Sequence, residues 1–331
     1  MGKILWFLSF YLCVSISFAD EAFQVVVLGS GGGPKESDVS GYLAAPIHSQ
    51  DFIALDAGSL LSGIYIAHQK GSFEGIEVDP NSPFHPAVDI FRHHIQAYLL
   101  SHAHLDHVLG LVINSTEDLP KPIFGIDVVI DFLRDYLFNG KIWPNFGSEG
   151  NSPCFSQYQY CRLVPEKKIA IPNTGMFVEP FLLSHPKEYL STAFLVESND
   201  SYLVYFGDTA PDCLEAKKRM DVIWKRLVPL ALEKKLKGIF LECSYLDKPD
   251  TELFGHLDAK HMMQELHYFA SLVDEVHPET ALQGVKILVT HIKDPLLKEG
   301  LFKQAIAEEL QRCNDLGVIF IFPSQGERIV L

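Results

Sequence analysis

Short apolar runs that end at polar or glycine-containing turns recur along the chain and predict β-strands. The first run, residues 24–28, leads into the glycine-rich segment 29–33 and then Pro34. Since Pro34 stands where a helix would have to open, this segment predicts a tight turn rather than a dinucleotide-binding loop. The other predicted strands cover residues 42–45, 52–56, 95–100, 237–242, 285–290 and 317–322, and short strands alternate with turns over 163–207.

Longer segments between these runs predict helices. The predicted helices cover residues 59–70, 212–236 and 258–275, and another begins at 108–112. Residues 71–92 are rich in Gly, Pro and Asp and predict a loop or a short helix, whereas 139–162 predict a long aromatic loop that shapes a pocket. Strands interleaved with helices in two halves predict an α/β fold, in which helices cover layers of sheet.

The first residues differ from the rest of the chain. Lys3 precedes the uncharged, mostly apolar run 4–18, and Ser17-Phe18-Ala19 forms a small-x-small cleavage pattern. This pattern predicts a secretory signal peptide over residues 1–19, with an uncleaved N-terminal anchor as the alternative. Residues 20–331 are then expected to be one exported, soluble domain, periplasmic or secreted, although 331 residues correspond to about two domains of average size.

Charge and cysteine content narrow the function further. The chain has 27 Lys and Arg against 42 Asp and Glu, a net charge of −15, which disfavours long nucleic acids as partners. After removal of the leader, an odd number of cysteines remains. Cys154 and Cys161 flank a polar loop, and a disulfide between them is left open. We expect Cys213, Cys243 and Cys313 to be small buried apolar residues.

The densest chemistry lies in the segment His102-Ala103-His104-Leu105-Asp106-His107. On an extended segment, alternate side chains point to the same side, so His102 and His104 are placed to bind one metal ion. A helix is predicted to begin directly afterwards, and it would turn Asp106 and His107 towards a second ion. Imidazole and carboxylate ligands suit zinc, and also manganese or iron.

One loop does not complete two coordination spheres, so other strand ends must contribute ligands. His185 follows the apolar run 181–183, and Asp208 and His291 each follow a predicted strand in the same way. Sites in α/β proteins collect their polar groups at such positions. Each of the three taken alone is more often an ordinary loop residue, but together with the histidine-rich loop they predict one metal centre.

This ordered set resembles the metallo-β-lactamase superfamily. The resemblance implies a four-layer αββα sandwich with two divalent metal ions, zinc first and manganese or iron as alternatives. It implies that the first ion is held by His102, His104 and His185, the second by Asp106, His107 and His291, and that Asp208 bridges them.

A narrower resemblance is to the class II 3′,5′-cyclic nucleotide phosphodiesterases of the exported bacterial type. It rests on residues 102–115, 241–245, 253–257 and the opening glycine-rich turn, with a departure at Thr116. The resemblance implies a small-molecule substrate. A metal-bridging hydroxide would hydrolyse cAMP, and cGMP as a second substrate, to the 5′-monophosphate. Whether the enzyme is a monomer or a homodimer is left open.

Glu242 ends a predicted strand and His256 precedes a predicted helix. In ribonuclease Z, a relative in the superfamily, a similar pair adjoins the metals. By this resemblance, His256 contacts the phosphate or protonates the leaving ribose oxygen, Glu242 orients its ring, and Asp106 orients the attacking water. The alternative is a helix-capping neighbourhood with a surface histidine.

Other functions remain open at this point. They are a ribonuclease Z-like phosphodiesterase, another exported hydrolase of the superfamily (a β-lactamase, lactonase or sulfatase), and a metal-binding protein without enzymatic activity. Export and negative charge disfavour a tRNA partner. In the 139–162 segment, Trp143, Phe146, Phe155 and Tyr158 are expected either to stack on the nucleobase or to pack as a lid on the core.

Overall fold

The computed structural model describes residues 21–298 and 300–331. The predicted signal peptide therefore lies outside the described residues. Within them, no helix combines the length and the apolar character that crossing a membrane requires.

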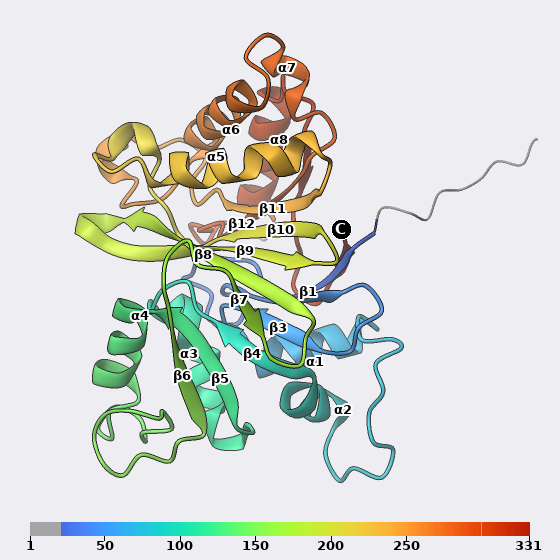
Figure 1. Ribbon diagram of the computed structural model, residues 1–331, viewed down its shortest axis with the longest axis vertical. Helices are drawn as coiled ribbons and strands as arrows, with labels where there is room; N and C mark the ends of the chain where they lie inside the picture. Colours follow the sequence, from blue (N-terminus) through green and yellow to red (C-terminus); the bar gives the residue numbers. More distant parts are fainter. Residues whose placement is uncertain (1–20, 299) are drawn as a thin grey trace, which may run out of the picture.

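Two mixed seven-stranded sheets form the centre of the molecule (Figure 1). The first has the order β14-β1-β2-β3-β4-β5-β6, and the second β13-β12-β11-β10-β9-β8-β7. The strands of the first sheet are β1 (Phe23–Gly29), β2 (Gly41–Pro46), β3 (Phe52–Leu55), β4 (Ile95–Leu99), β5 (Lys121–Ile126), β6 (Tyr158–Leu163) and β14 (Arg328–Val330). Those of the second are β7 (Ile169–Ile171), β8 (Met176–His185), β9 (Tyr189–Ser198), β10 (Ser201–Phe206), β11 (Leu236–Glu242), β12 (Lys286–Thr290) and β13 (Ile319–Ile321).

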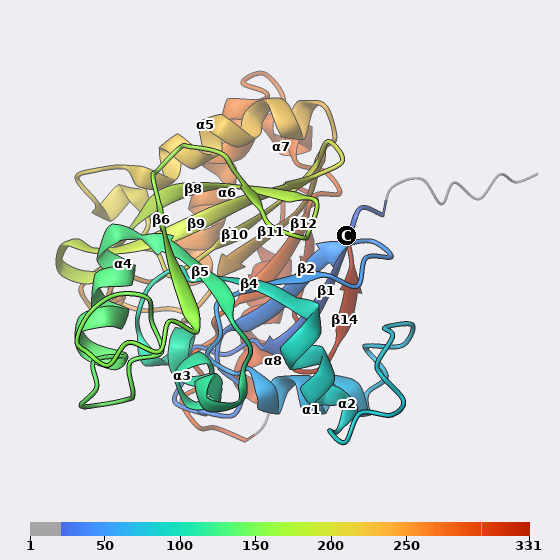
Figure 2. The same cartoon turned by 60° about the horizontal axis from the view of Figure 1, so that its bottom comes forward.

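Helices cover the outer face of each sheet (Figures 1 and 2). On the first sheet lie α1 (Leu61–Gln69), α2 (Pro86–Asp89), α3 (Leu105–Asn114) and α4 (Asp127–Phe132). On the second lie α5 (Arg219–Leu232), α6 (Ala259–Val273), α7 (Pro278–Ala281) and α8 (Leu301–Arg312). Short 3₁₀ or π segments are Ile90–His94, Ser115–Glu117, Leu133–Leu137, Pro186–Glu188, Asp212–Leu214 and Asp250–Glu252. The predicted αββα arrangement is confirmed.

Alternation along the strands of the second sheet produces two apolar layers. On β10, Leu203 and Tyr205 belong to the core between the sheets, whereas Val204 and Phe206 pack in the core under the helices. Successive side chains of a strand point to opposite faces, so a strand buried on both sides is apolar throughout. This is why β10, β11 and β12 read as continuous apolar runs in the sequence.

The strand β14 comes from the far end of the sequence and completes the edge of the first sheet. Gln24 pairs with Val330 and Val26 with Arg328, in antiparallel register. Sequence analysis did not predict this strand, since three residues carry too little pattern to identify one.

Two element predictions need correction. The predicted helix 212–236 starts only at Arg219, because the Asp212 carboxylate accepts hydrogen bonds from the backbone N–H groups of Met220 and Asp221, at 3.1 and 2.7 Å. Asp212 thereby caps the start of α5 rather than lying inside the helix. The predicted loop 139–162 is shorter than expected, because its last residues belong to β6 and pair with β5.

The cysteine and aromatic predictions are decided residue by residue. Cys154 and Cys161 are both free, so the structure contains no disulfide between them. Cys213 is exposed and Cys313 half-buried, so of the three cysteines expected in the core only Cys243 is fully buried.

Tyr158 packs inside the core and is closed to solvent, which excludes it from base stacking. Trp143 is half-buried and donates a hydrogen bond to the Ser115 hydroxyl at 2.9 Å. Phe146 also packs against the core, whereas Phe155 is 58% exposed. The segment is therefore mainly a lid on the core.

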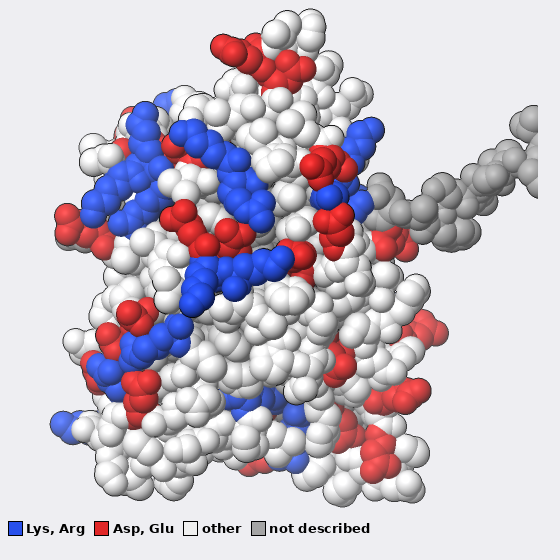
Figure 3. Space-filling view, viewed as in Figure 1, with Lys and Arg blue, Asp and Glu red and all other residues white. Residues whose placement is uncertain are grey.

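Charged side chains on the face shown in Figure 3 lie next to partners of opposite sign, over α5 and the neighbouring strands. Arg226 pairs with Glu179 at 3.0 Å, and Lys168 with Glu197 at 2.5 Å. This face presents mixed charge rather than an unbroken basic stripe.

Candidate metal centre

The histidine-rich loop leaves the first sheet at the end of β4 and enters α3. His104 has an extended backbone immediately before the helix, and Asp106 and His107 lie in its first turn. The loop is held against the turn after β3, where the backbone N–H of Ala57 donates to the His107 carbonyl at 2.8 Å. A side chain at Gly58 would collide with the Asp106 carbonyl, so glycine is needed for this close approach.

The second sheet supplies the remaining groups from one edge. The strands β10, β11 and β12 are neighbours and parallel, so their carboxyl ends lie side by side. Asp208 follows β10, Glu242 is the last residue of β11, and His291 follows β12. His185 is the last residue of β8, and His256 lies in the loop before α6.

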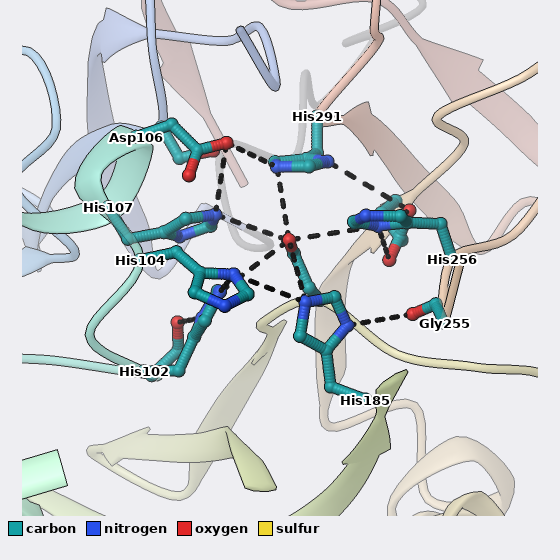
Figure 4. A network of polar contacts seen from close by, with 12 residues as sticks. His102, His104, Asp106, His107, His185, Gly255, His256 and His291 are labelled. Carbon is teal, nitrogen blue, oxygen red and sulfur yellow. Dashed lines mark hydrogen bonds and ion pairs between the residues drawn. The ribbon is translucent and has the colours of Figure 1, made fainter. Parts of the chain in front are cut away.

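Three overlapping groups of potential ligand atoms result, each with all its atoms within 4.8 Å of one another. They are His102, His104, His185 and Asp208; Asp106, His107 and His291; and Asp208, Glu242, His256 and His291. All seven predicted ligands are therefore brought together, along with the predicted pair Glu242 and His256. Figure 4 shows the predicted ligand histidines, Asp106 and His256 around one centre.

Asp208 lies between the groups. Its Oδ1 is 3.2 Å from the His107 Nε2, and its Oδ2 is 3.2 Å from the His291 Nε2. The same Oδ2 is 3.6 Å from the His102 Nε2. The second carboxylate, Asp106, lies 3.2 Å from the His291 Nε2. The Asp208 carboxylate, with one oxygen towards His107 and the other towards His102 and His291, is placed to contact metal ions in both groups.

Most imidazoles of the centre are fixed by a hydrogen bond from the outer nitrogen, which leaves the inner nitrogen facing the cluster; His104 is the exception, since its Nδ1 faces His102 and His185. The Nδ1–H of His102 donates to the Ser101 hydroxyl at 3.0 Å, and that of His185 donates to the Gly255 carbonyl at 2.8 Å. The Nδ1–H of His291 donates to the Ser244 hydroxyl at 2.9 Å. Such outer partners orient metal-binding histidines and select their tautomer.

The residue that holds His107 was missed by sequence analysis. Asp56, fully buried at the end of β3, accepts a hydrogen bond from the His107 Nδ1–H at 2.7 Å. It also accepts from the Ser101 backbone N–H, the Ser101 hydroxyl and the Tyr205 hydroxyl, at 2.7, 2.6 and 2.7 Å. Its only sequence signal is an aspartate that closes an apolar strand, which many loops share.

The electrostatics favour neutral, lone-pair-bearing imidazoles at the first group. Burial lowers the pKa of His102, and burial lowers the pKa of His185 to about 4. Their Nε2 atoms lie 3.0 and 3.3 Å from the His104 Nδ1. Nitrogen lone pairs facing one another at these distances are stabilised by a cation between them.

In the group of Asp106, His107 and His291, nearby carboxylates offset the effect of burial on the imidazole pKa of His107. Burial lowers the pKa of His107, but the carboxylates of Asp208, Asp56 and Asp106 outweigh burial and hold it well above its usual value. The Nε2 of His107 is buried and lies 3.2 Å from the Asp208 Oδ1, but the two are not aligned as a hydrogen bond. A positive charge is therefore favoured at this nitrogen, and a metal ion can replace the proton there. The donor set fits two divalent cations.

Glu242 and His256 form a separate pair beside these groups. The His256 Nδ1–H donates to the Glu242 Oε1 at 3.0 Å, and the Glu242 oxygens also accept from the Thr209 N–H at 2.8 Å and the Ser244 hydroxyl at 2.5 Å. Burial lowers the pKa of His256, but the Glu242 charge and hydrogen bond raise it above its ordinary value. His256 is therefore buried and paired with Glu242, unlike the surface histidine of the helix-capping alternative.

Comparisons with known proteins agree on a family. The model of the cAMP phosphodiesterases class-II matches residues 18–326. A 3′,5′-cyclic-nucleotide phosphodiesterase of Aliivibrio fischeri is 36% identical over 96% of this chain and 97% of its own. A probable 3′,5′-cyclic-nucleotide phosphodiesterase of Yersinia pestis is 37% identical over 97% of this chain and 92% of its own.

Solved structures share the fold at low identity. Unliganded yeast PDE1 is similar with a TM-score of 0.80 and 22% identity, over 94% of this chain and all of that one (100%). The metallo-β-lactamase fold protein YhfI of Bacillus subtilis has a TM-score of 0.58 at 15% identity, over 94% of this chain and 99% of that one. The four-layer fold is thus a metallo-β-lactamase fold.

We predict that Asp56→Asn weakens metal binding, because one side-chain oxygen is replaced by an NH₂ group that faces the donors around it. The affinity for the more weakly held ion should fall about 10- to 100-fold, the usual effect of losing an outer partner. Competition with a chromophoric chelator measures this affinity.

Asp118→Asn is the matched control. Asp118 is also buried and accepts hydrogen bonds from two tyrosines, Tyr98 and Tyr158, but it lies outside the three groups. The Asp118→Asn variant should have a lower free energy of unfolding and an unchanged metal affinity. Wild-type metal affinity in the Asp56 variant would show that Asp56 only stabilises the fold.

Proposed function

This chain belongs to the class II cAMP phosphodiesterase family. We propose that the groups around Asp208 hydrolyse the phosphodiester of 3′,5′-cyclic nucleotides, with cAMP as the main substrate and cGMP as a second one. The protein is a 3′,5′-cyclic-nucleotide phosphodiesterase with buried His and Asp clusters consistent with a binuclear metal site. The observation that carries the mechanism is the central position of Asp208 between two sets of histidines. The identity of the ions, the roles of single residues and the location of the protein are parts of the same proposal.

Two divalent cations, zinc in preference to manganese or iron, are the cofactors we propose. His102, His104 and His185 would hold one, Asp106, His107 and His291 the other, and Asp208 would contact both. Ions bound there would lower the pKa of a water molecule and stabilise charge on the phosphoryl group. Glu242 is an outer residue rather than a ligand, because Thr209, Ser244 and His256 already donate to its oxygens.

The chain's own residues complete the reaction. Asp106, the one carboxylate of the centre that is not fully buried, would accept a hydrogen bond from the attacking water and orient it. As water adds to phosphorus, the bond from phosphorus to the 3′ oxygen breaks, and His256 would give that oxygen a proton from its Nε2. Glu242 holds the His256 ring and favours its protonated form. The product is the nucleoside 5′-monophosphate.

A small substrate fits the charge of the protein better than a nucleic acid. Net charge is −15, and the face in Figure 3 pairs its Lys and Arg with Asp and Glu. A tRNA partner would need a basic surface to neutralise its phosphates. A likeness to human tRNase Z, short form, at a TM-score of 0.51 and 15% identity over 92% of this chain and 98% of that one, concerns the fold alone.

Export is proposed from the sequence of residues 1–19. We predict that the protein recovered from a periplasmic or extracellular fraction begins near Asp20, because cleavage after Ala19 removes the apolar run. N-terminal sequencing of that protein measures it. Recovery of the intact N-terminus from a membrane fraction would instead support the uncleaved anchor.

We predict that Asp208→Ala loses both metal binding and activity. Metal analysis should find less than the full complement in the variant, and conversion of cAMP to AMP should fall at least about a thousandfold, because charge stabilisation by the ions contributes several kcal/mol. The wild-type protein, analysed for zinc, manganese and iron, provides the reference.

The control is Asp212→Asn, which changes another buried carboxylate in the same segment without touching the centre. It should keep its metal. Full occupancy by two ions in Asp208→Ala would contradict the ligand assignment, and absence of cAMP hydrolysis by metal-loaded wild type would contradict the function.

We predict that His256→Asn lowers kcat for cAMP about 10²- to 10⁴-fold while metal content stays at the wild-type level, since a general acid contributes about this much. A diester with a p-nitrophenolate leaving group needs no protonation and should lose far less. Parallel kinetics on the two substrates measure the difference. Equal losses on both would show that His256 does not act on the leaving oxygen.

A further inference from the structure

A cavity of about 520 Å³ is lined by the segments that follow β11 and β12. Its walls are mainly apolar and include Pro34, Tyr245, Leu246, Leu296 and Phe302. Pockets of this size, apolar with a few polar groups, are typical of small-molecule sites. Neither the metal groups nor the proposed acid–base pair accounts for it.

Two residues connect this cavity to the centre. Tyr245 lines it, and the Tyr245 ring lies edge-on to the His256 ring with centroids 6.0 Å apart. Lys293 also lines it, and the Lys293 backbone N–H donates at 3.1 Å to the carbonyl of Ser244, the residue whose hydroxyl holds His291. The cavity therefore adjoins the side of the centre formed by His256 and His291.

Lys293 brings a positive charge to that junction. It is half-buried and lines the cavity. Lys293 is placed next to the centre by the chain itself, because it lies two residues after His291 and lines the cavity. Asp247, Lys248 and Asp294 add polar groups elsewhere in the lining.

The chemistry of a cyclic nucleotide indicates on which side of the metal centre the nucleoside lies. Both ester oxygens of its phosphate belong to one ribose, so the nucleoside lies wherever the leaving oxygen lies. If His256 protonates that oxygen, the ribose and base must extend from the His256 side of the centre. On the opposite side, the Tyr189 ring stacks on His104 with centroids 4.7 Å apart.

We propose that this cavity binds the nucleoside part of the cyclic nucleotide, with the base against Tyr245 and Phe302 and the Lys293 ammonium beside the phosphate. The inference rests on the proposed function and identifies the residues that would determine substrate affinity. Phe302 and Lys293 are then specificity and positioning residues, and neither is a metal ligand.

The test compares KM and kcat for cAMP in Phe302→Leu and Lys293→Gln. Loss of stacking or of a charged contact should raise KM about tenfold or more, leave metal content unchanged and change kcat only about twofold. Lys298→Gln is the matched control, since Lys298 is an exposed lysine of the same loop outside the cavity lining, and its KM should stay at the wild-type value.

Binding of AMP, measured by calorimetry, gives a readout that does not depend on turnover. Phe302→Leu should weaken AMP binding by the same factor; because Phe302 also packs against the core, a cooperative melting curve must show that the variant is folded at the assay temperature. Phe132→Leu alters an aromatic residue on the opposite side, which stacks on Tyr189 with centroids 5.5 Å apart, and should leave KM unchanged.

Unchanged KM and AMP binding in both cavity variants, in a wild-type enzyme that does hydrolyse cAMP, would overturn the proposal. A raised KM in Phe132→Leu alone would also overturn it, by placing the nucleoside on the other side. Failure of the wild type to hydrolyse cAMP would instead overturn the proposed function.

Discussion

A buried negative charge at Asp208 is the constraint on which the rest of the site depends. Burial raises the pKa of Asp208, but His291 and His107 outweigh burial and hold the pKa well below its usual value, and His102 lies 3.6 Å from the same carboxylate. Those rings act only if their nitrogens face the carboxylate. Each therefore needs a partner on its outer side, and Ser244, Asp56 and Ser101 supply these hydrogen bonds.

The two sheets meet at this carboxylate. The second sheet brings Asp208, Glu242 and His291 together because β10, β11 and β12 are parallel neighbours. The first sheet brings the loop after β4, and Asp56 at the end of β3 holds that loop while it accepts a hydrogen bond from Tyr205 of the second sheet. Packing of the sheets and assembly of the site are thus one event, which explains why the site residues are spread over the whole chain.

The proposed ligands stand out in the sequence because their signals are local. The histidine-rich loop concentrates metal-binding side chains, and Asp208 and His291 directly follow apolar strands. The outer partners were not predictable, because Asp56 and Ser244 act through contacts with residues 47 to 51 positions away in the chain. The start of α5 was misplaced because a side chain, Asp212, caps it from outside the helical pattern.

The pairing of β14 with β1 has a consequence for how the chain folds. Val330 of β14 pairs with Gln24 of β1. One edge of the first sheet can therefore form only after nearly all of the chain has been synthesised. Contacts of such sequence separation carry a large loop-closure entropy and slow the search for the native state. Until the C-terminal residues have been synthesised, the first sheet lacks its edge strand β14 and the edge of β1 is unpaired. This edge is the expected point of misassociation between incomplete chains.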